Sequence, residues 1–156
     1  MKKKNKILVV RSKYNNTRSL YKGAFAELKK NKVYNREILV NGAFEIPVTI
    51  ARNINNFDGF IAIGIIIKGQ TPNFELISYA ITNGLMELSI KSKKPIGNAI
   101  LTCLNSKQAT DRGHKGKEAA EAVLDVLKAK KILWISSLQN PITAQEWKLF
   151  KNYMVI

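Results

Sequence analysis

The residues best suited to chemistry lie within residues 58–77, DGFIAIGIIIKGQTPNFELI. A loop at residues 68–73, which contains Gly69 and Thr71, directly follows an isoleucine-rich run at residues 60–67. Such an apolar run is typical of a strand that is buried on both faces of a parallel sheet. In open α/β sheets, ligands bind at the carboxyl ends of the strands, where loop N–H groups and a helix N-terminus can hold an anionic group. We therefore expect a small-molecule site at this loop.

Apolar runs alternate along the chain with segments of helical periodicity. Strands are predicted at residues 6–10, 36–40, 60–67 and 96–102, and helices at residues 17–31, 47–55, 75–92, 106–112 and 117–130. Strands that alternate with helices indicate a parallel sheet with helices packed on both of its faces. The predicted fold class is therefore α/β: a three-layer αβα sandwich built on a four-stranded parallel sheet.

Several local features sharpen this prediction. Thr17 is expected to cap the first helix, and Pro47 suits the first turn of the second. The side chains expected to face the core are Leu20, Ala24, Phe25 and Leu28 in the first helix and Leu76, Ile77, Ala80, Ile81, Gly84, Leu85 and Leu88 in the helix at residues 75–92. We interpret residues 1–156 as one domain with an atypical C-terminal tail at residues 131–156. The tail has an apolar run at residues 132–135, a turn at Asn140-Pro141 and the pattern of an amphipathic helix at residues 143–153.

Composition limits the classes of function. With 46% hydrophobic residues the chain is globular, and its longest apolar stretch, at residues 59–67, is too short to span a bilayer. The apolar run after the N-terminal lysines is also too short for the core of a signal peptide. The single cysteine, Cys103, excludes an internal disulfide, and no zinc-binding pattern is present. These features favour a reducing, cytoplasmic location.

The formal net charge of +15 is the most unusual property of the composition. Lysine and arginine neutralise phosphates, so a polyanionic partner such as RNA is one interpretation. The lysines are, however, spread over the whole chain, and no basic run alternates with aromatic residues that could stack on bases. We favour an ordinary solvated surface and expect neither nucleic acid nor a membrane as a partner.

Three sequence blocks resemble a known enzyme family in their order and spacing. They are GAFEIP at residues 42–47, GIIIKGQTPNF at residues 64–74, and Asp111-Arg112 followed by Lys115-Gly116. This combination resembles the 6,7-dimethyl-8-ribityllumazine synthase (lumazine synthase) family over roughly residues 6–130. The resemblance implies a flavodoxin-like fold and a homopentamer with active sites between neighbouring subunits. Because the chain begins close to its first strand, the N-terminal strand that often pairs with a neighbour's sheet is not expected, which argues against a larger shell of pentamers.

The resemblance also implies a reaction. Members of this family are transferases of riboflavin biosynthesis that act at its penultimate step. They condense 5-amino-6-(D-ribitylamino)uracil with 3,4-dihydroxy-2-butanone 4-phosphate, release phosphate and water, and need no metal or organic cofactor. The expected partners of this chain are therefore these two small molecules and other copies of itself.

Individual residues take on roles through this resemblance. The pyrimidine side comprises Tyr14 (ring stacking), Ala43, Phe44 and Glu45 (ribityl chain), and Ile65, Ile66 and Ile67 (uracil edge, through backbone amides). The phosphate side comprises Gly69, Gln70 and Thr71 (phosphate cradle), Arg112 (phosphate clamp and catalytic residue) and Lys115. An aromatic face suits a flat heterocycle, a carboxylate accepts hydroxyl protons, and a guanidinium fork fits a phosphate. Alternatives remain: Tyr14 as a half-buried loop tyrosine, Glu45 as a charge at a helix N-terminus, and Arg112 as a solvated helix-end cation.

Two positions depart from the family pattern. Asn73 stands where the family carries a histidine that is proposed to shuttle protons, and Asn98 stands where an aromatic residue from the adjacent subunit usually covers the pyrimidine. Asparagine does not titrate, and losing a general acid–base group typically slows a reaction by about 10²–10⁴-fold. The only histidine, His114, is expected to be an exposed loop residue rather than a replacement.

Three hypotheses follow. The first is an active but slow lumazine synthase, because holding two reactants together provides much of the rate enhancement without a proton shuttle. The second is a catalytically weakened or inactive homologue that serves as a flavin- or lumazine-binding protein or as a scaffold. The third, an unrelated basic α/β module that binds RNA, ranks last because it leaves the three motifs unexplained.

Overall fold

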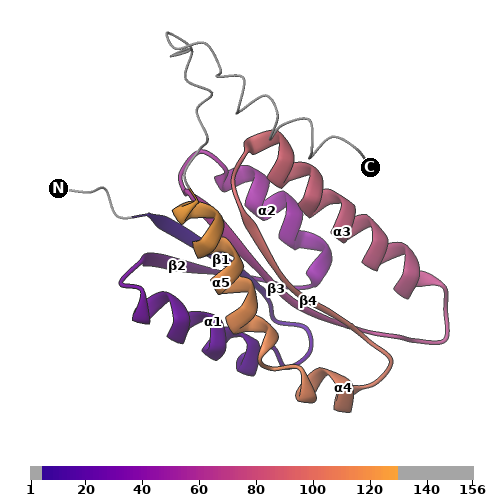
Figure 1. The fold of residues 1–156 in the computed structure, drawn as a ribbon. Coiled ribbons are helices and arrows are strands. Elements are labelled where there is room, and N and C mark those ends of the chain that lie inside the picture. The colour runs from indigo at the N-terminus through magenta and orange to yellow at the C-terminus, as the bar shows by residue number, and fades with distance from the viewer. Residues whose placement is uncertain (1–4, 130–156) are drawn as a thin grey trace, which may run out of the picture.

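A four-stranded parallel sheet forms the centre of the molecule. The computed structural model describes residues 5–129. The strands are β1 (Lys6–Ser12), β2 (Tyr34–Val40), β3 (Gly59–Ile67) and β4 (Ile96–Cys103), in the spatial order β2-β1-β3-β4 with every neighbouring pair parallel (Figure 1). The helices are α1 (Arg18–Lys30), α2 (Ile46–Asn53), α3 (Asn73–Ser92), α4 (Ser106–Asp111) and α5 (Lys115–Lys128), with a 3₁₀ turn, η1 (Ala43–Glu45), before α2. The predicted α/β class and parallel sheet are confirmed.

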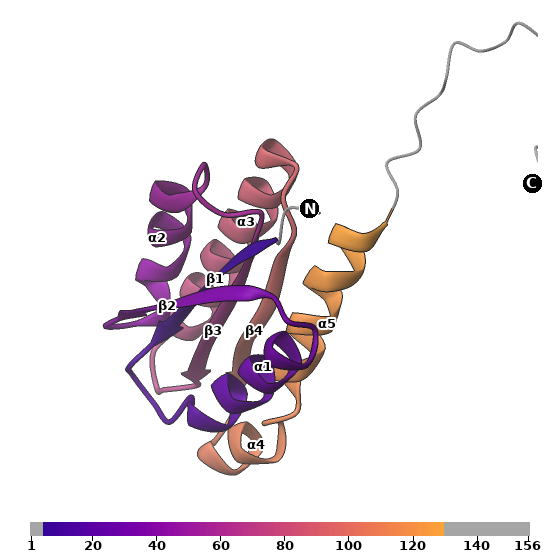
Figure 2. The ribbon, with the colours of Figure 1, turned by 90° about the vertical axis from the view of Figure 1, so that its left-hand side faces the viewer.

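The helices form one layer on each face of the sheet. Figure 2 shows α2 and α3 on one side of the strands and α1 and α5 on the other. The alternation of side chains along β1 explains this arrangement: Ile7 and Val9 lie in the core shared with α1 and α5, whereas Leu8 and Val10 lie in the core shared with α2 and α3. All four side chains are at most 1% exposed. Each such fully buried side chain contributes about 1.5–3 kcal/mol of hydrophobic stabilisation.

The close packing of α5 against α1 depends on Gly116. A Cβ atom at this position would lie 1.9 Å from the carbonyl oxygen of Leu20, so any larger residue would force the two helices apart. Gly116 is therefore a contact between helix backbones, in the first turn of α5. This contact fixes the beginning of α5, and with it Lys115, relative to α1.

The observed elements are longer than predicted at several ends. β1 continues to Ser12 and β2 begins at Tyr34, because parallel pairing extends over the full register from Lys6↔Tyr34 to Ser12↔Val40. α3 begins at Asn73 and α5 at Lys115, each two residues earlier than predicted. The prediction of Pro47 in the first turn of α2 is confirmed. Local propensity defines such ends only to within a residue or two, and tertiary pairing decides them.

Three predictions about side chains are wrong. Phe25 is 40% exposed and Leu76 is 68% exposed, and Ala80 is exposed as well, although all three were expected to face the core. In α3 the apolar residues nearly surround the helix, so periodicity does not single out the face, and only Ile81 and Leu85 are fully covered. The prediction of Thr17 as the N-cap residue of α1 is confirmed in position, although its side chain makes no capping hydrogen bond.

The predicted features of the tail, at residues 131–156, lie outside the described residues. Within residues 5–129, no helix combines the length and apolar character needed to cross a membrane. In the same range, no group of three or more histidine, cysteine, aspartate or glutamate residues is arranged to hold a metal ion.

Candidate functional site

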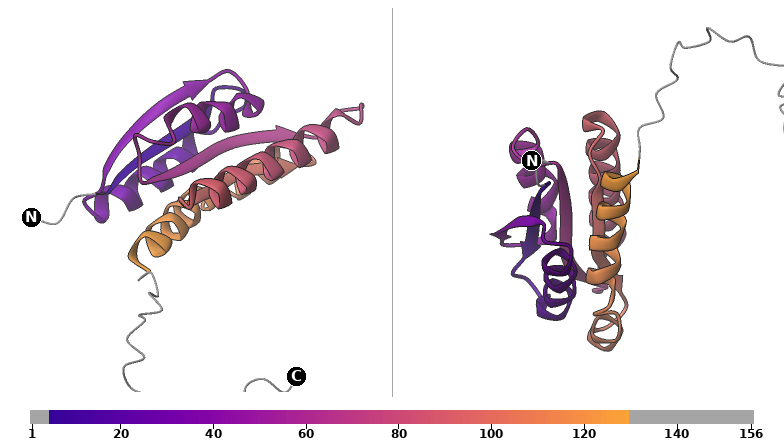
Figure 3. Two further views of the ribbon diagram at one scale, coloured as in Figure 1. Left: turned by 90° about the horizontal axis from the view of Figure 1, so that it is seen from above. Right: turned by 60° about the vertical axis from the view of Figure 1, so that its left-hand side comes forward.

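A cavity of about 520 Å³ opens at the carboxyl ends of β1 and β3. The β3–α3 loop projects at the end of the molecule toward which β3 points (Figure 3, left). The predicted site residues that line this cavity are Tyr14, Ala43, Phe44, Glu45, Ile65, Ile66, Ile67, Gly69, Thr71 and Asn73. They come from three separate segments: the β1–α1 loop, η1, and the continuous stretch from the end of β3 to the first residue of α3. We call this space the first cavity.

The β1–α1 loop presents Tyr14 and Asn15 to the first cavity. The backbone N–H of Tyr14 donates to the carbonyl of Asn41 (3.0 Å), which ties the loop to the end of β2, and its side chain is 72% exposed. Asn15 adopts a left-handed backbone conformation with φ 64°, and its Nδ2 donates to the carbonyl of Ile65 (2.9 Å). The loop is therefore fastened to both neighbouring strands. Tyr14 has the exposure that a stacking residue needs.

The position of Glu45 is compatible with both roles considered for it. Its Oε2 accepts a hydrogen bond from the backbone N–H of Gly42 (2.7 Å), an N–H that precedes the helical turn. The residue also lines the first cavity. Since the capping contact uses one carboxylate oxygen, the second is available to accept a hydrogen bond from a ligand hydroxyl.

The β3–α3 loop brings Gly69, Thr71 and Asn73 to the cavity, with Asn73 as the first residue of α3. A Cβ atom built on Gly69 would meet no other atom within 4 Å, so the space beside this residue is open. The Lys68 ammonium donates to Glu75 Oε1 (2.7 Å), and this hydrogen bond lowers the pKa of the Glu75 carboxyl. The ion pair joins the loop to the first turn of α3.

The remaining predicted residues lie elsewhere. Asn98, Arg112 and Lys115 line a second cavity, of about 550 Å³, between the edge strand β4 and the start of α5. Gln70 lies in the β3–α3 loop but lines neither cavity. Among the residues that the structure describes, none lines both cavities, so the predicted site is divided into two parts within one chain.

Two of the charged groups that line the second cavity, Lys115 and Glu118, form an ion pair within the chain. The Lys115 ammonium donates to Glu118 Oε2 (2.6 Å), and this contact lowers the pKa of the Glu118 carboxyl. Arg112 has its Nη1 3.9 Å from the sulfur of Cys103, a weak contact that leaves the guanidinium exposed. On the edge strand, Asn98 accepts a hydrogen bond from the backbone N–H of Ile100 (2.9 Å). His114 is exposed, with its Nε2 3.5 Å from Glu118, and lines neither cavity.

Several lining residues were not predicted from the sequence. In the first cavity these are Asn15, Asn41, Gly42, Phe74 and Ile77, and in the second they are Ile100, Leu101, Thr102, Glu118, Ala119 and Ala122. Asn15 had a recognisable signal, because asparagine tolerates the left-handed conformation that a tight loop requires. Gly42 and Phe74 lie inside the motif blocks at residues 42–47 and 64–74, next to predicted residues. The positions of the others follow from how the elements pack in the folded chain.

The fold and the first cavity define a three-layer α/β protein with a ligand site at the carboxyl ends of its strands. The model of a family described as 6,7-dimethyl-8-ribityllumazine synthase matches residues 4–131, and the chain belongs to this family. Its similarity to the 6,7-dimethyl-8-ribityllumazine synthase of Cutibacterium acnes is 37% identity over 134 residues, covering 80% of this chain and 81% of the relative. The synthase of Bartonella tribocorum is 38% identical over 141 residues, covering 84% of this chain and 93% of the relative. The family resemblance inferred from the three motifs is confirmed.

Proposed function

We propose that this chain condenses 5-amino-6-(D-ribitylamino)uracil with 3,4-dihydroxy-2-butanone 4-phosphate, as a cytoplasmic transferase of riboflavin biosynthesis. The observation that carries the proposal is the convergence of three separate segments, all bearing family-like residues, on the first cavity. The single cysteine, Cys103, is buried and free, which is in keeping with a reducing compartment.

The lining of the first cavity suits the pyrimidine substrate. Tyr14 offers an exposed aromatic face to the flat ring, and Glu45 offers a carboxylate oxygen to the ribityl hydroxyls. The backbone at the end of β3, from Ile65 to Ile67, offers polar groups to the uracil edge. Gly69 and Thr71 lie beside the N-terminus of α3, where N–H groups and the helix dipole favour the phosphate of the second substrate.

We further propose that each complete site forms between two copies of the chain in a homopentamer. Arg112, Lys115 and Asn98 of one copy would then border the first cavity of the next, where Arg112 and Lys115 hold the phosphate. Two observations support this. The cations line a cavity of their own within one chain, and α3 exposes a row of large apolar side chains, Leu76, Tyr79, Met86 and Ile90, which are 60–72% exposed. An apolar row of this kind is characteristic of a surface that another protein covers.

Asn73 makes the proposed reaction slow rather than impossible. Proximity and orientation of two bound reactants alone correspond to a large effective concentration. Proton transfers during imine formation and phosphate loss would then pass through solvent, because the Asn73 amide does not titrate. The same residue supports the second candidate function, a lumazine- or flavin-binding or scaffold homologue without turnover.

A product-absorbance assay with both substrates tests the proposal. The parent chain is expected to form lumazine faster than an enzyme-free blank, which is needed because the condensation also proceeds slowly without a catalyst. A rate equal to the blank, together with retained binding of 5-amino-6-(D-ribitylamino)uracil, would establish the second candidate function instead. A rate equal to the blank without binding would exclude both.

Mixing two variants tests whether the site is shared. Glu45→Ala damages the first cavity and Arg112→Ala damages the second, so each variant alone is expected to be nearly inactive. If the two cavities of neighbouring copies form one site, unfolding and refolding the variants together restores up to about a quarter of the parent rate by random assortment. A mixture that stays as inactive as its components would show that the site lies within one chain.

A further inference from the structure

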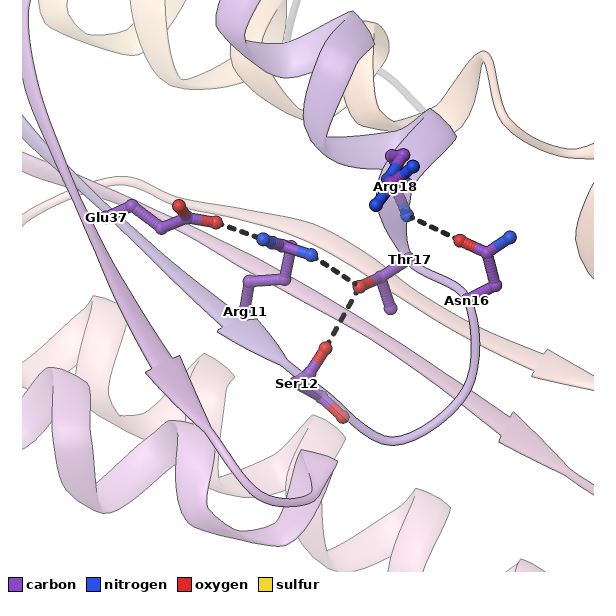
Figure 4. Close-up of polar contacts among 6 residues, drawn as sticks. All are labelled: Arg11, Ser12, Asn16, Thr17, Arg18 and Glu37. Carbon is purple, nitrogen blue, oxygen red and sulfur yellow. Dashed lines mark hydrogen bonds and ion pairs between the residues drawn. The ribbon is translucent and has the colours of Figure 1, made fainter.

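The base of the β1–α1 loop is closed by a hydrogen bond between its two ends. Thr17 Oγ1 donates to the carbonyl of Ser12 (2.9 Å), which links the residue that precedes α1 to the last residue of β1 (Figure 4). Ser12 and Thr17 are only 0% and 2% exposed. The residues between them, Lys13 to Asn16, include the two that line the first cavity, Tyr14 and Asn15.

Arg11 links this closure to β2. Its Nη1 donates to Thr17 Oγ1 (3.3 Å), and its Nε donates to Glu37 Oε1 on β2 (2.5 Å), as Figure 4 shows. The guanidinium also lies 4.8 Å from the ring centroid of Tyr21 on α1. The side chains of Arg11 and Glu37 are only 20% and 25% exposed, so this contact is shielded more than a surface ion pair. One side chain therefore connects β1, β2, α1 and the loop.

The closure is connected to Tyr14 through Ser12. The Ser12 hydroxyl accepts a hydrogen bond from the backbone N–H of Tyr14 (3.1 Å) and donates to its carbonyl (3.2 Å). At the base of the loop, Asn16 Oδ1 accepts from the backbone N–H of Arg18 (3.2 Å), also drawn in Figure 4. Both backbone polar groups of Tyr14 are thus held by Ser12, which the hydrogen bond from Thr17 holds in turn.

We propose that Thr17, Arg11 and Glu37 are positioning residues for the pyrimidine substrate. None of the three lines either cavity, so they act by holding the loop that presents Tyr14 and Asn15. The inference rests on the proposed function. We expect the three residues to affect binding of the pyrimidine substrate only. The residues expected to hold the second substrate belong to other segments, the β3–α3 loop and the start of α5.

Thr17→Val tests the inference, since it removes the hydroxyl and keeps the branched shape. We expect KM for 5-amino-6-(D-ribitylamino)uracil to rise about three- to tenfold, the effect of losing hydrogen bonds of ordinary strength, while KM for the butanone phosphate stays unchanged. Thr17→Ser, which keeps the hydroxyl, is expected to restore the parent KM. Glu37→Gln keeps the size of the side chain and removes its charge, and we expect a smaller rise confined to the same substrate.

Ser89→Ala is the matched control. Ser89 Oγ donates to the carbonyl of Lys94 (2.9 Å), a hydrogen bond that spans five residues as that of Thr17 does. It is partly buried and lies just before the first residue of β4, and neither residue lines the first or the second cavity. This variant is expected to lose stability comparably and to leave both KM values unchanged. If Thr17→Val leaves the pyrimidine KM unchanged, or raises both KM values together as a general loss of structure would, the inference is wrong.

Direct binding separates this inference from the proposed function. Calorimetric titration of the parent, Thr17→Val and Thr17→Ser with 5-amino-6-(D-ribitylamino)uracil needs no turnover. Weaker binding by Thr17→Val alone supports the positioning role even if the parent forms no product. A parent that turns over normally, with equal binding by all three proteins, overturns the inference and leaves the proposed function intact. A parent protein that neither binds this substrate nor forms product would exclude both the inference and the proposed function.

Discussion

The two cavities differ in what a single chain provides. The first cavity is lined by an aromatic ring, backbone groups and the carboxylate of Glu45, and its loops are fastened to the sheet from several sides. The second lies along the edge strand β4 and contains the cations Arg112 and Lys115, of which Lys115 is paired with Glu118. The two cations are therefore separated, within one chain, from the aromatic ring, the carboxylate and the β3–α3 loop that line the first cavity. The proposed assembly joins the two sets.

A variant that cannot assemble is expected to have the largest effect, because it would keep the two cavities of neighbouring copies apart. Met86 is 60% exposed on α3, and burying an aspartate there against a neighbouring copy would cost several kcal/mol. We expect Met86→Asp to reduce the mass in solution to that of the monomer, 17.6 kDa, and the rate to that of the blank. Light scattering after size exclusion measures the mass.

Val126→Asp on α5 is the control for this change, because Val126 has a similar exposure of 59%. It is expected to keep the parent mass and rate. A monomeric Met86→Asp variant that retains full activity would show that one chain contains the whole site.

Removing Arg112, the proposed phosphate clamp, is expected to have the next largest effect. Arg112→Ala deletes a guanidinium that no other residue of the second cavity replaces in shape, and loss of one such charge-stabilising donor typically lowers kcat/KM about 10²–10³-fold. Steady-state kinetics with the butanone phosphate varied provides the measurement. Arg52→Ala, at an exposed arginine on α2, is the control and should leave the rate unchanged. An Arg112→Ala variant with the parent kcat/KM would remove Arg112 from the site.

Placing at residue 73 the histidine that the family resemblance implies tests the contribution of the first cavity to proton transfer. Asn73 is the first residue of α3 and lines the cavity, so Asn73→His introduces a group that titrates near neutral pH at the site. We expect kcat to rise about ten- to a hundredfold, up to the lower end of the usual range of about 10²–10⁴-fold for general acid–base catalysis. A new ionisation between pH 5 and 8 should appear in the pH dependence of kcat. An unchanged rate would mean that proton transfer does not limit this protein.

The smallest expected effect concerns Glu118. Its carboxylate accepts the Lys115 hydrogen bond and so competes with a substrate phosphate for that cation. Glu118→Gln is expected to lower KM for the butanone phosphate about two- to threefold, in line with the weak energy of an exposed ion pair. A raised KM would mean instead that Glu118 helps to hold Lys115 in place.

The same pair predicts a pH dependence of stability. The contact lowers the folded-state pKa of Glu118 below the ordinary glutamate value of 4.5, so its stabilisation is present above that pH and is lost as the pH falls through the folded pKa. The difference in thermal midpoint between the parent and Glu118→Gln should therefore be largest near neutral pH and disappear in acid. A difference that persists unchanged in acid would exclude this origin.

The sequence predicted the centre of the sheet well because the two central strands, β1 and β3, are buried on both faces. An uninterrupted apolar run such as that of β3, of which Gly59 to Ile65 are buried, has few other interpretations in a short chain with alternating helices. The orientation of α3 was harder to predict, because Leu76 and Ile81 are equally apolar and only the neighbouring elements decide which one is covered. Where apolar residues surround a helix, spacing alone does not identify its buried face.

The candidate site was only partly predictable for a related reason. Residues of the GAFEIP and GIIIKGQTPNF blocks line one cavity, whereas Arg112, from the third block, lines another. Motif spacing carries no information on whether two segments meet within a chain or between chains. The closure by Arg11, Thr17 and Glu37 went unrecognised because it joins side chains from three elements, and no local pattern signals it.

Gly69 has a consequence for how this protein tolerates change. Its backbone is not left-handed, and the space where a side chain would begin is empty, so folding gives no reason for glycine at this position. If a phosphate occupies that space, an alanine would fill the place of the ligand without disturbing the chain. Such a variant would fold as stably as the parent and would escape degradation in the cell, but it would lack its function. Selection on growth without external riboflavin, rather than on stability, would be the force that retains the glycine.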